Sequence, residues 1–291
     1  MDHCVFIHTN HKQITGALVA KYALKRNSPN ADKFDVQIID TADYPWLQEH
    51  EGRMYLRDGV QRVWLNDDLQ SLTPLRFMPP KLMGYQGRAV VIDPDIFAVG
   101  DIWELLSRDM EDKAVMCRMR SGPKGYIDKC MASSVMLLDC AKLRHWDAEQ
   151  GFREMFEFKR DYQPWICLKL EDRESIGFFE PEWNDFDRLT RQTKMLHNTR
   201  RRTQPWNTGL PTDWRPAERF RLFPPVAWAM RARRKLLGEY ALLGNYKPHP
   251  DSNQERFFFG LLKECVEQGI VTEEMLRDQM QRNHVRHDAF E

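Results

Sequence analysis

The chain has 291 residues, and its 43 lysines and arginines match its 43 aspartates and glutamates, so its formal net charge is zero. This length suffices for one large α/β domain with an appendage. Because the chain has no overall positive field, nucleic acid is not an expected partner. Charged and ionisable residues recur through residues 1–21, and no run of about 18 apolar residues occurs. We therefore expect no signal peptide and no membrane span, and hence a cytoplasmic protein.

The first 40 residues predict a strand, a helix and a second strand. Residues 4–9 form a short apolar run, residues 13–26 have helical spacing, and residues 34–40 alternate in part. This order is typical of a βαβ unit with parallel strands. Ligands of open α/β sheets bind beyond the carboxyl ends of the strands. Thr9 and Asn10, at the end of the first strand, are therefore candidate binding residues.

Two aspartates follow the apolar run of residues 89–92, with Pro94 between them. The run predicts a buried strand. Asp93 and Asp95 at its end would repel each other and lose hydration unless a cation neutralised them. Oxygen ligands favour Mg²⁺ or Mn²⁺. A simple turn is the alternative interpretation of an Asp-Pro-Asp sequence.

The remaining elements are predicted from shorter patterns. Residues 46–66 give no clear prediction, and residues 74–85 predict a helix interrupted by Pro79 and Pro80. Asp101 is placed to cap a short helix. The other expected elements are strands at residues 113–118 and 133–139 and helices near 151–159, 227–243 and 255–268. The six cysteines contain no C-x-x-C pair and have mostly apolar neighbours, so we expect buried, reduced thiols.

A histidine and three arginines occur together late in the chain. His197 follows an apolar pair, and Arg200, Arg201 and Arg202 precede Pro205 and Trp206. A neutral imidazole is a good ligand for Mn²⁺, and guanidinium forks match phosphate oxygens. A solvated basic loop is the alternative interpretation of the arginines.

The Asp-X-Asp segment and the late His-to-Pro-Trp segment resemble glycosyltransferase family 8, the class containing glycogenin and bacterial lipooligosaccharide galactosyltransferases. The resemblance implies a GT-A, Rossmann-like fold, with a mixed, mostly parallel sheet flanked by helices. It implies Mn²⁺ or Mg²⁺ bound by Asp93, Asp95 and His197, and Trp206 near the diphosphate. The change of character near residue 215 divides the chain into a catalytic domain, 1–215, and a basic, mainly helical C-terminal region, 216–291.

Further site residues are carried over from the family pattern. Gln204 stands where the family has a lysine that holds the diphosphate, so we expect Arg200, Arg201 or Arg202 to supply that charge. The family's asparagine and glycine are missing around Ser133 and Ser134. The resemblance assigns the nucleobase and ribose to Thr9 and Asn10, the donor sugar to Ser133 and Ser134, and the reacting centre to Asp161 and Gln163.

The expected activity is transfer of a hexose from a nucleoside diphosphate sugar, UDP-linked, to a hydroxyl group of a glycan, a lipid-linked acceptor or a small molecule. Family 8 enzymes retain anomeric configuration, and no carboxylate of this chain is a convincing covalent nucleophile. A same-face route is therefore expected. One alternative is a sugar nucleotidyltransferase, although residues 8–16 lack its Gly-rich loop. Another is a sugar-, nucleotide- or RNA-binding protein with a degenerate site.

The segment from Arg215 to Lys235 contains seven basic residues and one acid, Glu218, interleaved with aromatic residues. Such segments can lie on anionic membrane surfaces. A packing helix with a solvated basic face is the alternative. We expect a cytoplasmic protein that contacts the inner face of a membrane through this segment.

Overall fold

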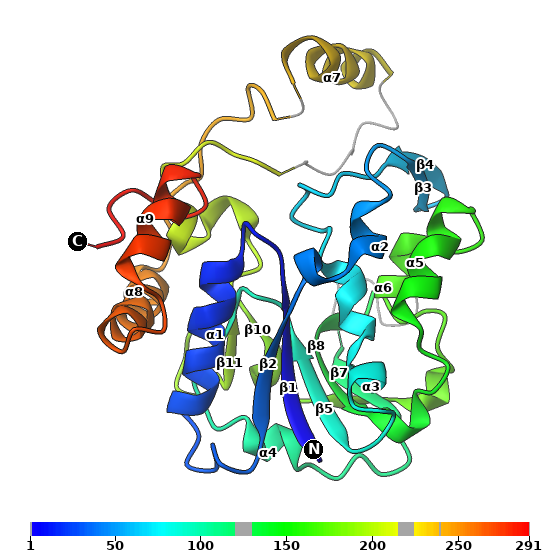
Figure 1. The fold of residues 1–291 in the computed structure, drawn as a ribbon, viewed down its shortest axis with the longest axis vertical. Helices are drawn as coiled ribbons and strands as arrows, with labels where there is room; N and C mark the ends of the chain where they lie inside the picture. The colour runs from blue at the N-terminus through cyan, green and yellow to red at the C-terminus, as the bar shows by residue number, and fades with distance from the viewer. Residues whose placement is uncertain (1, 120–129, 215–223, 239, 291) are drawn as a thin grey trace.

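A mixed six-stranded sheet forms the centre of the molecule (Figure 1). The computed structural model describes residues 2–119, 130–214, 224–238 and 240–290. The strand order is β2-β1-β5-β8-β7-β9, and only β8 runs against the others. The expected α/β class with a mostly parallel sheet is confirmed. The strands are β1 (His3–Thr9), β2 (Asp35–Asp40), β5 (Arg88–Ile92), β7 (Val115–Arg118), β8 (Ala132–Asp139) and β9 (Ile176–Phe179).

Two smaller sheets complete the strand content of the described residues. One has the order β10-β11-β6 and joins the end of the Asp-Pro-Asp segment to the segment that contains His197. The other is the hairpin β3–β4, which lies within residues 46–66, where no element was predicted. Their bounds are β3 (Met54–Arg57), β4 (Val60–Val63), β6 (Ile96–Ala98), β10 (Asp185–Phe186) and β11 (Met195–His197).

Helices cover both faces of the central sheet, with α1 and α8 on one side and α5 and α6 on the other (Figure 1). Val5 and Ile7 of β1 face the core beneath α1, whereas Cys4 and Phe6 face the opposite core. A central parallel strand is buried on both faces, which explains its continuous apolar run. The helices are α1 (Ile14–Arg26), α2 (Pro45–Gln48), α3 (Pro79–Leu82), α4 (Trp103–Leu106), α5 (Ala148–Phe156), α6 (Tyr162–Ile166), α7 (Pro224–Leu237), α8 (Ser252–Glu267) and α9 (Glu273–Gln281).

The predicted helices are confirmed with changed bounds. The interrupted helix of residues 74–85 is a 3-10 segment, Thr73–Phe77, followed by α3. The Asp101 carboxylate accepts a hydrogen bond from the Trp103 amide at 3.0 Å, at the start of α4. α7 ends at Leu237, because Gly238 adopts a positive φ of 100°. None of the helices in the described ranges has the length and hydropathy needed to cross a membrane.

The cysteine prediction is wrong for one pair. Cys130, just before β8, forms a disulfide with Cys167, which caps the end of α6. Their spacing of 37 residues hides the pair in the sequence, because only the packing of α6 against β8 brings them together. The other cysteines are free and buried, as expected: Cys4, Cys117, Cys140 and Cys265. Disulfides are rare in the cytosol, so this pair weighs against the cytoplasmic expectation.

Candidate functional site

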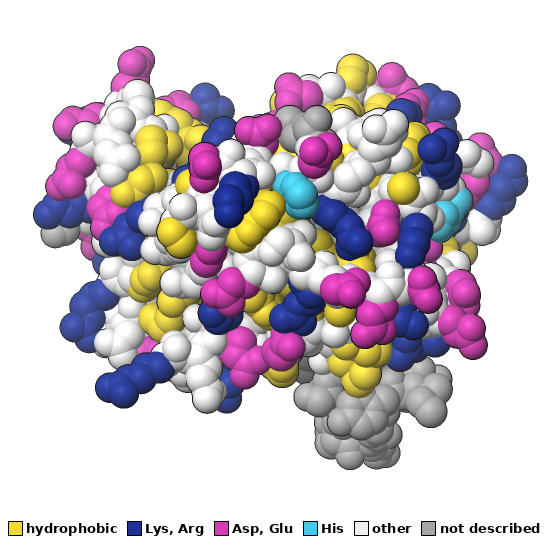
Figure 2. All heavy atoms as spheres, turned by 90° about the horizontal axis from the view of Figure 1, so that it is seen from below, with side chains coloured by type: hydrophobic (Ala, Val, Ile, Leu, Met, Phe, Trp, Pro, Cys, Tyr) yellow, Lys and Arg dark blue, Asp and Glu magenta, His cyan; other side chains and the backbone are white. Residues whose placement is uncertain are grey.

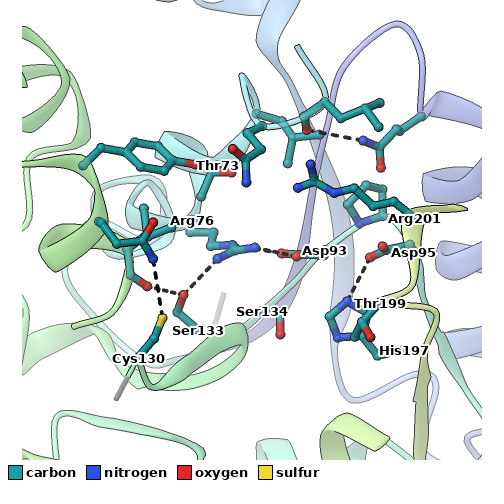
Figure 3. A pocket seen from close by; sticks show the side chains of 18 of the residues that line it. Thr73, Arg76, Asp93, Asp95, Cys130, Ser133, Ser134, His197, Thr199 and Arg201 are labelled. Carbon is teal, nitrogen blue, oxygen red and sulfur yellow. Dashed lines mark hydrogen bonds and ion pairs between the residues drawn. The ribbon is translucent and has the colours of Figure 1, made fainter. Parts of the chain in front are cut away.

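A polar cavity of about 230 Å³ lies beyond the carboxyl ends of the central strands. Its lining includes Asp93 and Asp95 after β5, Ser133 and Ser134 of β8, and His197 of β11. Figure 3 shows Arg76 and Asp93 in contact within this cavity, with His197 and Arg201 close to Asp95. The position agrees with the rule that ligands of open α/β sheets bind outside the carboxyl ends of strands.

Antiparallel pairing of β11 with β6 brings His197 to the two aspartates. Asp95 directly precedes β6, and His197 pairs with Ile96, the first residue of that strand. The Asn198 amide donates to the Asp95 carbonyl oxygen at 3.1 Å. As a result, one oxygen each of Asp93 and Asp95 and one nitrogen of His197 lie within 4.8 Å of one another.

Asn184 fixes the orientation of the His197 ring. The Asn184 Nδ2 group donates to Ser134 Oγ at 2.9 Å, so the Asn184 Oδ1 atom faces His197 Nδ1, 2.8 Å away. An amide oxygen can only accept, and Nδ1 therefore carries the imidazole proton. In the neutral ring the His197 Nε2 atom is then an unprotonated acceptor, and it lies 3.3 Å from the Asp95 Oδ1 atom; an imidazolium would instead donate to that oxygen.

With a neutral imidazole, two acceptor atoms face each other here with no proton between them. The Asp95 Oδ1 atom is buried and has no hydrogen-bond partner among the described residues. Facing acceptors repel each other unless a cation lies beside both, and carboxylate and imidazole groups suit Mn²⁺ or Mg²⁺. The donor set therefore fits a divalent cation. Gln204 Nε2 donates to the other oxygen of Asp95 at 3.0 Å and orients it.

Asp93 is held by two positively polarised groups. Arg76 Nε donates to its Oδ1 atom at 2.9 Å, Arg76 Nη2 donates to its Oδ2 atom, and His8 Nε2 lies 3.1 Å from Oδ1. Burial opposes the charge on Asp93, but the Arg76 guanidinium and His8 outweigh it and hold the pKa of this carboxyl well below its usual range. Complete burial lowers the pKa of His8 despite the nearby carboxylate. His8 is therefore neutral and Asp93 ionised at neutral pH.

A glycine allows α1 to approach the Asp-Pro-Asp segment. A Cβ atom on Gly16 would lie 2.7 Å from the Pro94 carbonyl oxygen. That contact is with backbone, which cannot move aside cheaply. Gly16 therefore fixes how closely the first helix packs beside the candidate metal ligands.

The structure brings some of the other predicted residues to the cavity. Gln163 and Arg201 line it together with Ser133 and Ser134. Ser133 Oγ accepts a hydrogen bond from Arg76 Nη1 at 2.9 Å and donates to the Ile166 carbonyl at 2.5 Å. These two contacts tie the serine, the arginine and the end of α6 into one wall of the cavity.

Other predicted residues lie outside the cavity lining. Thr9 and Asn10 are buried behind it, and Asn10 Nδ2 donates to Ser71 Oγ at 3.3 Å. Trp206 is packed in the core against Phe97 and Phe258. The indole therefore supports the fold at this point and does not face the cavity.

Arg200 and Arg202 also point elsewhere, unlike Arg201. The Arg200 side chain is 66% exposed, and its Nε atom lies 3.8 Å from an Asp187 oxygen. Arg202 Nη2 donates to the Leu243 carbonyl oxygen at 3.4 Å. Of the three adjacent arginines, only Arg201 is part of the cavity lining in the described structure.

The Asp161 carboxylate is occupied by hydrogen bonds to the backbone. Its carboxylate accepts from the Asp58 amide at 2.9 Å, the Gly59 amide at 2.7 Å and the Gln163 amide at 2.9 Å. It therefore caps α6 and anchors the β3–β4 turn at the same time. Three backbone hydrogen bonds leave this carboxylate committed to holding the hairpin against α6.

Sequence reasoning missed Arg76, Asn184 in its role behind His197, and Arg57. Arg76 lies in a 3-10 segment between prolines, where no motif marks it. Asn184 lies directly before β10, and its contact with His197 depends on the pairing of β10 with β11. Arg57 ends a strand that the sequence did not predict.

No protein-family model and no curated protein sequence matches this chain. Solved glycosyltransferase structures resemble it. An active-site mutant of LgtC aligns with a TM-score of 0.50 and 11% identity over 70% of this chain and 89% of LgtC. GlyE from Streptococcus pneumoniae aligns with a TM-score of 0.49 and 14% identity over 93% of this chain and 64% of GlyE. WbbM, a bifunctional glycosyltransferase, aligns with a TM-score of 0.49 and 13% identity over 71% of this chain, which spans 47% of WbbM. At such identities the likeness shows the fold alone, which is that of GT-A glycosyltransferases.

Proposed function

We propose that the protein is a metal-dependent, retaining glycosyltransferase that moves a hexose from a UDP-linked donor to a hydroxyl group of a glycan, a lipid-linked acceptor or a small molecule. The observation that carries this proposal is the cluster of His197 Nε2 with oxygens of Asp95 and Asp93 in a polar cavity at the carboxyl ends of the strands, where Nε2 and Asp95 Oδ1 face each other as acceptors when the imidazole is neutral. The glycosyltransferase-like fold supports the same reading.

Asp95, His197 and Asp93 would hold Mn²⁺ or Mg²⁺. Bound there, the ion would supply a Lewis acid for the charge that develops on the leaving diphosphate. Asn184 keeps the His197 proton on Nδ1, and Gln204 orients Asp95. Asp93 already accepts from Arg76, yet each carboxylate oxygen has two lone pairs and can also face a cation. We infer that Asp95 and His197 are the stronger ligands and Asp93 the weaker one.

Transfer with retention is supported by the scarcity of carboxylates in the cavity. Asp93 and Asp95 are its only acids among the described lining residues. Asp161, the carboxylate that the family pattern assigns to the reacting centre, is committed to three backbone amides. With no free carboxylate to attack the sugar, a same-face route is favoured, in which the departing diphosphate accepts the proton of the attacking hydroxyl. Gln163 lies on the cavity wall, where its amide can orient the sugar.

Arg201 takes the place of the missing diphosphate lysine. We expect Arg201→Gln to weaken UDP binding in the presence of Mn²⁺ by about 10- to 100-fold, because a hydrogen bond to a charged group is worth about 1.5–3 kcal/mol. Calorimetric titration would measure this. Arg200→Gln and Arg202→Gln are matched controls, since both side chains point away from the cavity, and an equal loss in all three variants would contradict the assignment.

The test of the proposed function is a thermal shift assay with UDP and Mn²⁺ together and separately. A ligand that binds the native state raises the melting temperature. We expect a larger shift with both than with either alone. Product analysis by NMR with a UDP-hexose should then show an α-linked product from an α-linked donor. If no nucleoside diphosphate stabilises the protein with Mn²⁺, the transferase proposal fails and a sugar- or RNA-binding protein becomes the better interpretation.

A further inference from the structure

We propose that Arg57 forms a subsite for an anionic group, a carboxylate or a phosphate, carried by one of the sugar substrates. This inference rests on the proposed transferase function. Among the described residues that line the cavity, two carboxylates face three guanidinium groups, those of Arg57, Arg76 and Arg201. Arg76 is paired with Asp93, and Arg201 is assigned to the donor diphosphate. The charge of a divalent cation beside Asp95 would be balanced by that carboxylate and the donor diphosphate. No carboxylate of the described cavity lining then remains to pair with Arg57.

The side chains that contact Arg57 directly are uncharged. Its Nη1 atom donates to Gln70 Oε1, and its guanidinium carbon lies 4.6 Å from the centre of the Tyr162 ring. Its Nε atom is buried with no hydrogen-bond partner among the described residues. The Asp68 carboxylate attracts this guanidinium, but no ion pair between the two is found among the described residues, and Asp68 accepts the Gln70 amide at 2.8 Å. A half-buried guanidinium with an amide and a phenol ring beside it retains its full positive charge.

The position of Arg57 is fixed by the hairpin that carries it. Arg57 is the last residue of β3, and Asp58 and Gly59 form the turn with positive φ angles of 52° and 69°. Such a turn has the twist that a two-residue hairpin needs. The Asp161 carboxylate binds the amides of both turn residues, so the hairpin is anchored to α6. Arg57 is therefore presented to the cavity by a supported element rather than by a free loop.

The ligand follows from this chemistry. A guanidinium fork matches the oxygens of a carboxylate or phosphate, whereas an uncharged hexose would leave the buried charge unpaired. The anion could come from the donor, as the carboxylate of a UDP-linked uronic acid. It could equally come from the acceptor, as a phosphate or carboxylate on the sugar that receives the hexose. Both sources place an oxyanion beside Arg57.

Two calorimetric titrations distinguish the sources. In the first, the protein with Mn²⁺ is titrated with UDP-glucose and UDP-glucuronate, which differ only at carbon 6. In the second, the protein with Mn²⁺ and UDP is titrated with glucose, glucuronate and glucose 6-phosphate. We expect the anionic compound to bind at least about 10-fold more tightly in one of the two arms, as expected for one charged hydrogen-bonded contact.

Arg57→Met should remove that preference while leaving binding of UDP with Mn²⁺ unchanged. Arg57→Lys should restore part of it, because the charge remains without the fork. Arg53→Met, an exposed arginine near the same hairpin, should retain it. The inference is overturned if wild type binds charged and neutral compounds equally in both arms, or if the preference survives Arg57→Met. Failure of UDP to bind at all would instead overturn the proposed function.

A second observation concerns α7, and we infer from it that this helix lies on an anionic lipid surface. Large apolar side chains among its described residues are on the outside: Trp228 is 65% exposed and Leu236 is 79% exposed. Ala229 and Ala232 are also exposed and share their face at helical spacing. A helix of a soluble protein normally turns its apolar stripe to the core. Leu237, at 58% exposure, extends the apolar surface at the end of the helix.

The basic composition of α7 and of the residues that precede it in the sequence selects the partner. Lys235 is exposed beside the apolar face, and the sequence of the segment from Arg215 to Lys235 has seven basic residues and one acid. α7 lies on the side of the molecule toward which β1 and β5 point with their carboxyl ends, the side of the cavity (Figure 1). By contrast, acidic and basic side chains are interleaved across the opposite face (Figure 2). Apolar and basic groups together suit an anionic bilayer.

Cosedimentation with vesicles tests this inference. Wild type should bind vesicles that contain phosphatidylglycerol, bind phosphatidylcholine vesicles less, and lose binding as salt is raised. A Trp228→Ser/Leu236→Ser variant should lose binding, whereas Leu170→Ser, which removes a 51% exposed leucine elsewhere, should not. Equal binding by the double variant, or association of the protein with itself in place of lipid, would overturn the inference.

Discussion

Asp95→Asn is expected to abolish the Mn²⁺ dependence of UDP binding and to reduce transfer by about 10²–10³-fold. The substitution preserves shape but replaces one carboxylate oxygen by an amide nitrogen. In the native protein the Asp95 Oδ1 atom faces the His197 Nε2 atom at 3.3 Å, and both are acceptors when the imidazole is neutral. With the uncharged amide, one orientation would place a donor opposite His197 and remove the need for a cation. Isothermal titration with Mn²⁺ would measure the loss directly.

The matched control is Asp278→Asn, an exposed carboxylate on α9 that pairs with Arg282. It should leave Mn²⁺ and UDP binding unchanged. Asp93→Asn should weaken Mn²⁺ less than Asp95→Asn, because Asp93 already accepts hydrogen bonds from Arg76. An Asp95→Asn protein that still binds Mn²⁺ like wild type would contradict the assignment of the metal site.

The sequence predicted the parts of the site that depend on strand ends. The apolar run before Asp93 predicted the buried strand β5, and the βαβ order of the first 40 residues predicted the parallel pairing of β1 with β2. His197 was assigned by family resemblance, and pairing of β11 with β6 provides a structural basis for that assignment. These features are local runs of sequence or fixed topology, so they can be read without coordinates.

Contacts between distant loops could not be predicted in the same way. Arg76 reaches Asp93 from a proline-flanked segment 17 positions earlier, and nothing in its local pattern distinguishes it from other surface arginines. Cys130 and Cys167 meet only after α6 has packed beside β8. Trp206 was assigned to the diphosphate because of its Pro-Trp context, yet its ring packs in the core. Side-chain direction in an irregular segment depends on tertiary packing, which the residue pattern does not encode.

The hydrogen bonds of the two aspartates explain how Arg76 and the proposed metal site can lie next to each other. Arg76 compensates Asp93, and the hydrogen bond from Gln204 leaves one oxygen of Asp95 open. The two carboxylates therefore differ in their environments, although they are two residues apart and look equivalent in sequence. Because of this asymmetry, the buried charge of Asp93 requires Arg76 as its partner, whereas one oxygen of Asp95 is open to a ligand.

Arg76→Met should therefore destabilise the fold, by about 3 kcal/mol at neutral pH, because it leaves Asp93 ionised and buried without its main partner. The side chains of Arg76 and Asp93 are only 12% and 14% exposed. In wild type, the lowered pKa of Asp93 contributes stability that is fully present above its unfolded value of 3.8 and is lost as the pH falls through the lower folded value. The variant lacks this contribution, so its deficit should shrink below about pH 3.8.

Urea denaturation at pH 7 and pH 3 would measure both effects. Asp93→Asn in the Arg76→Met background should recover part of the loss, because the amide carries no buried charge, and a double-mutant cycle isolates the coupling between the two side chains. Arg277→Met, which breaks an exposed pair with Glu273, should change stability little and serves as the control. Equal losses at both pH values, or additive effects in the cycle, would show that Arg76 acts through packing rather than through the charge of Asp93.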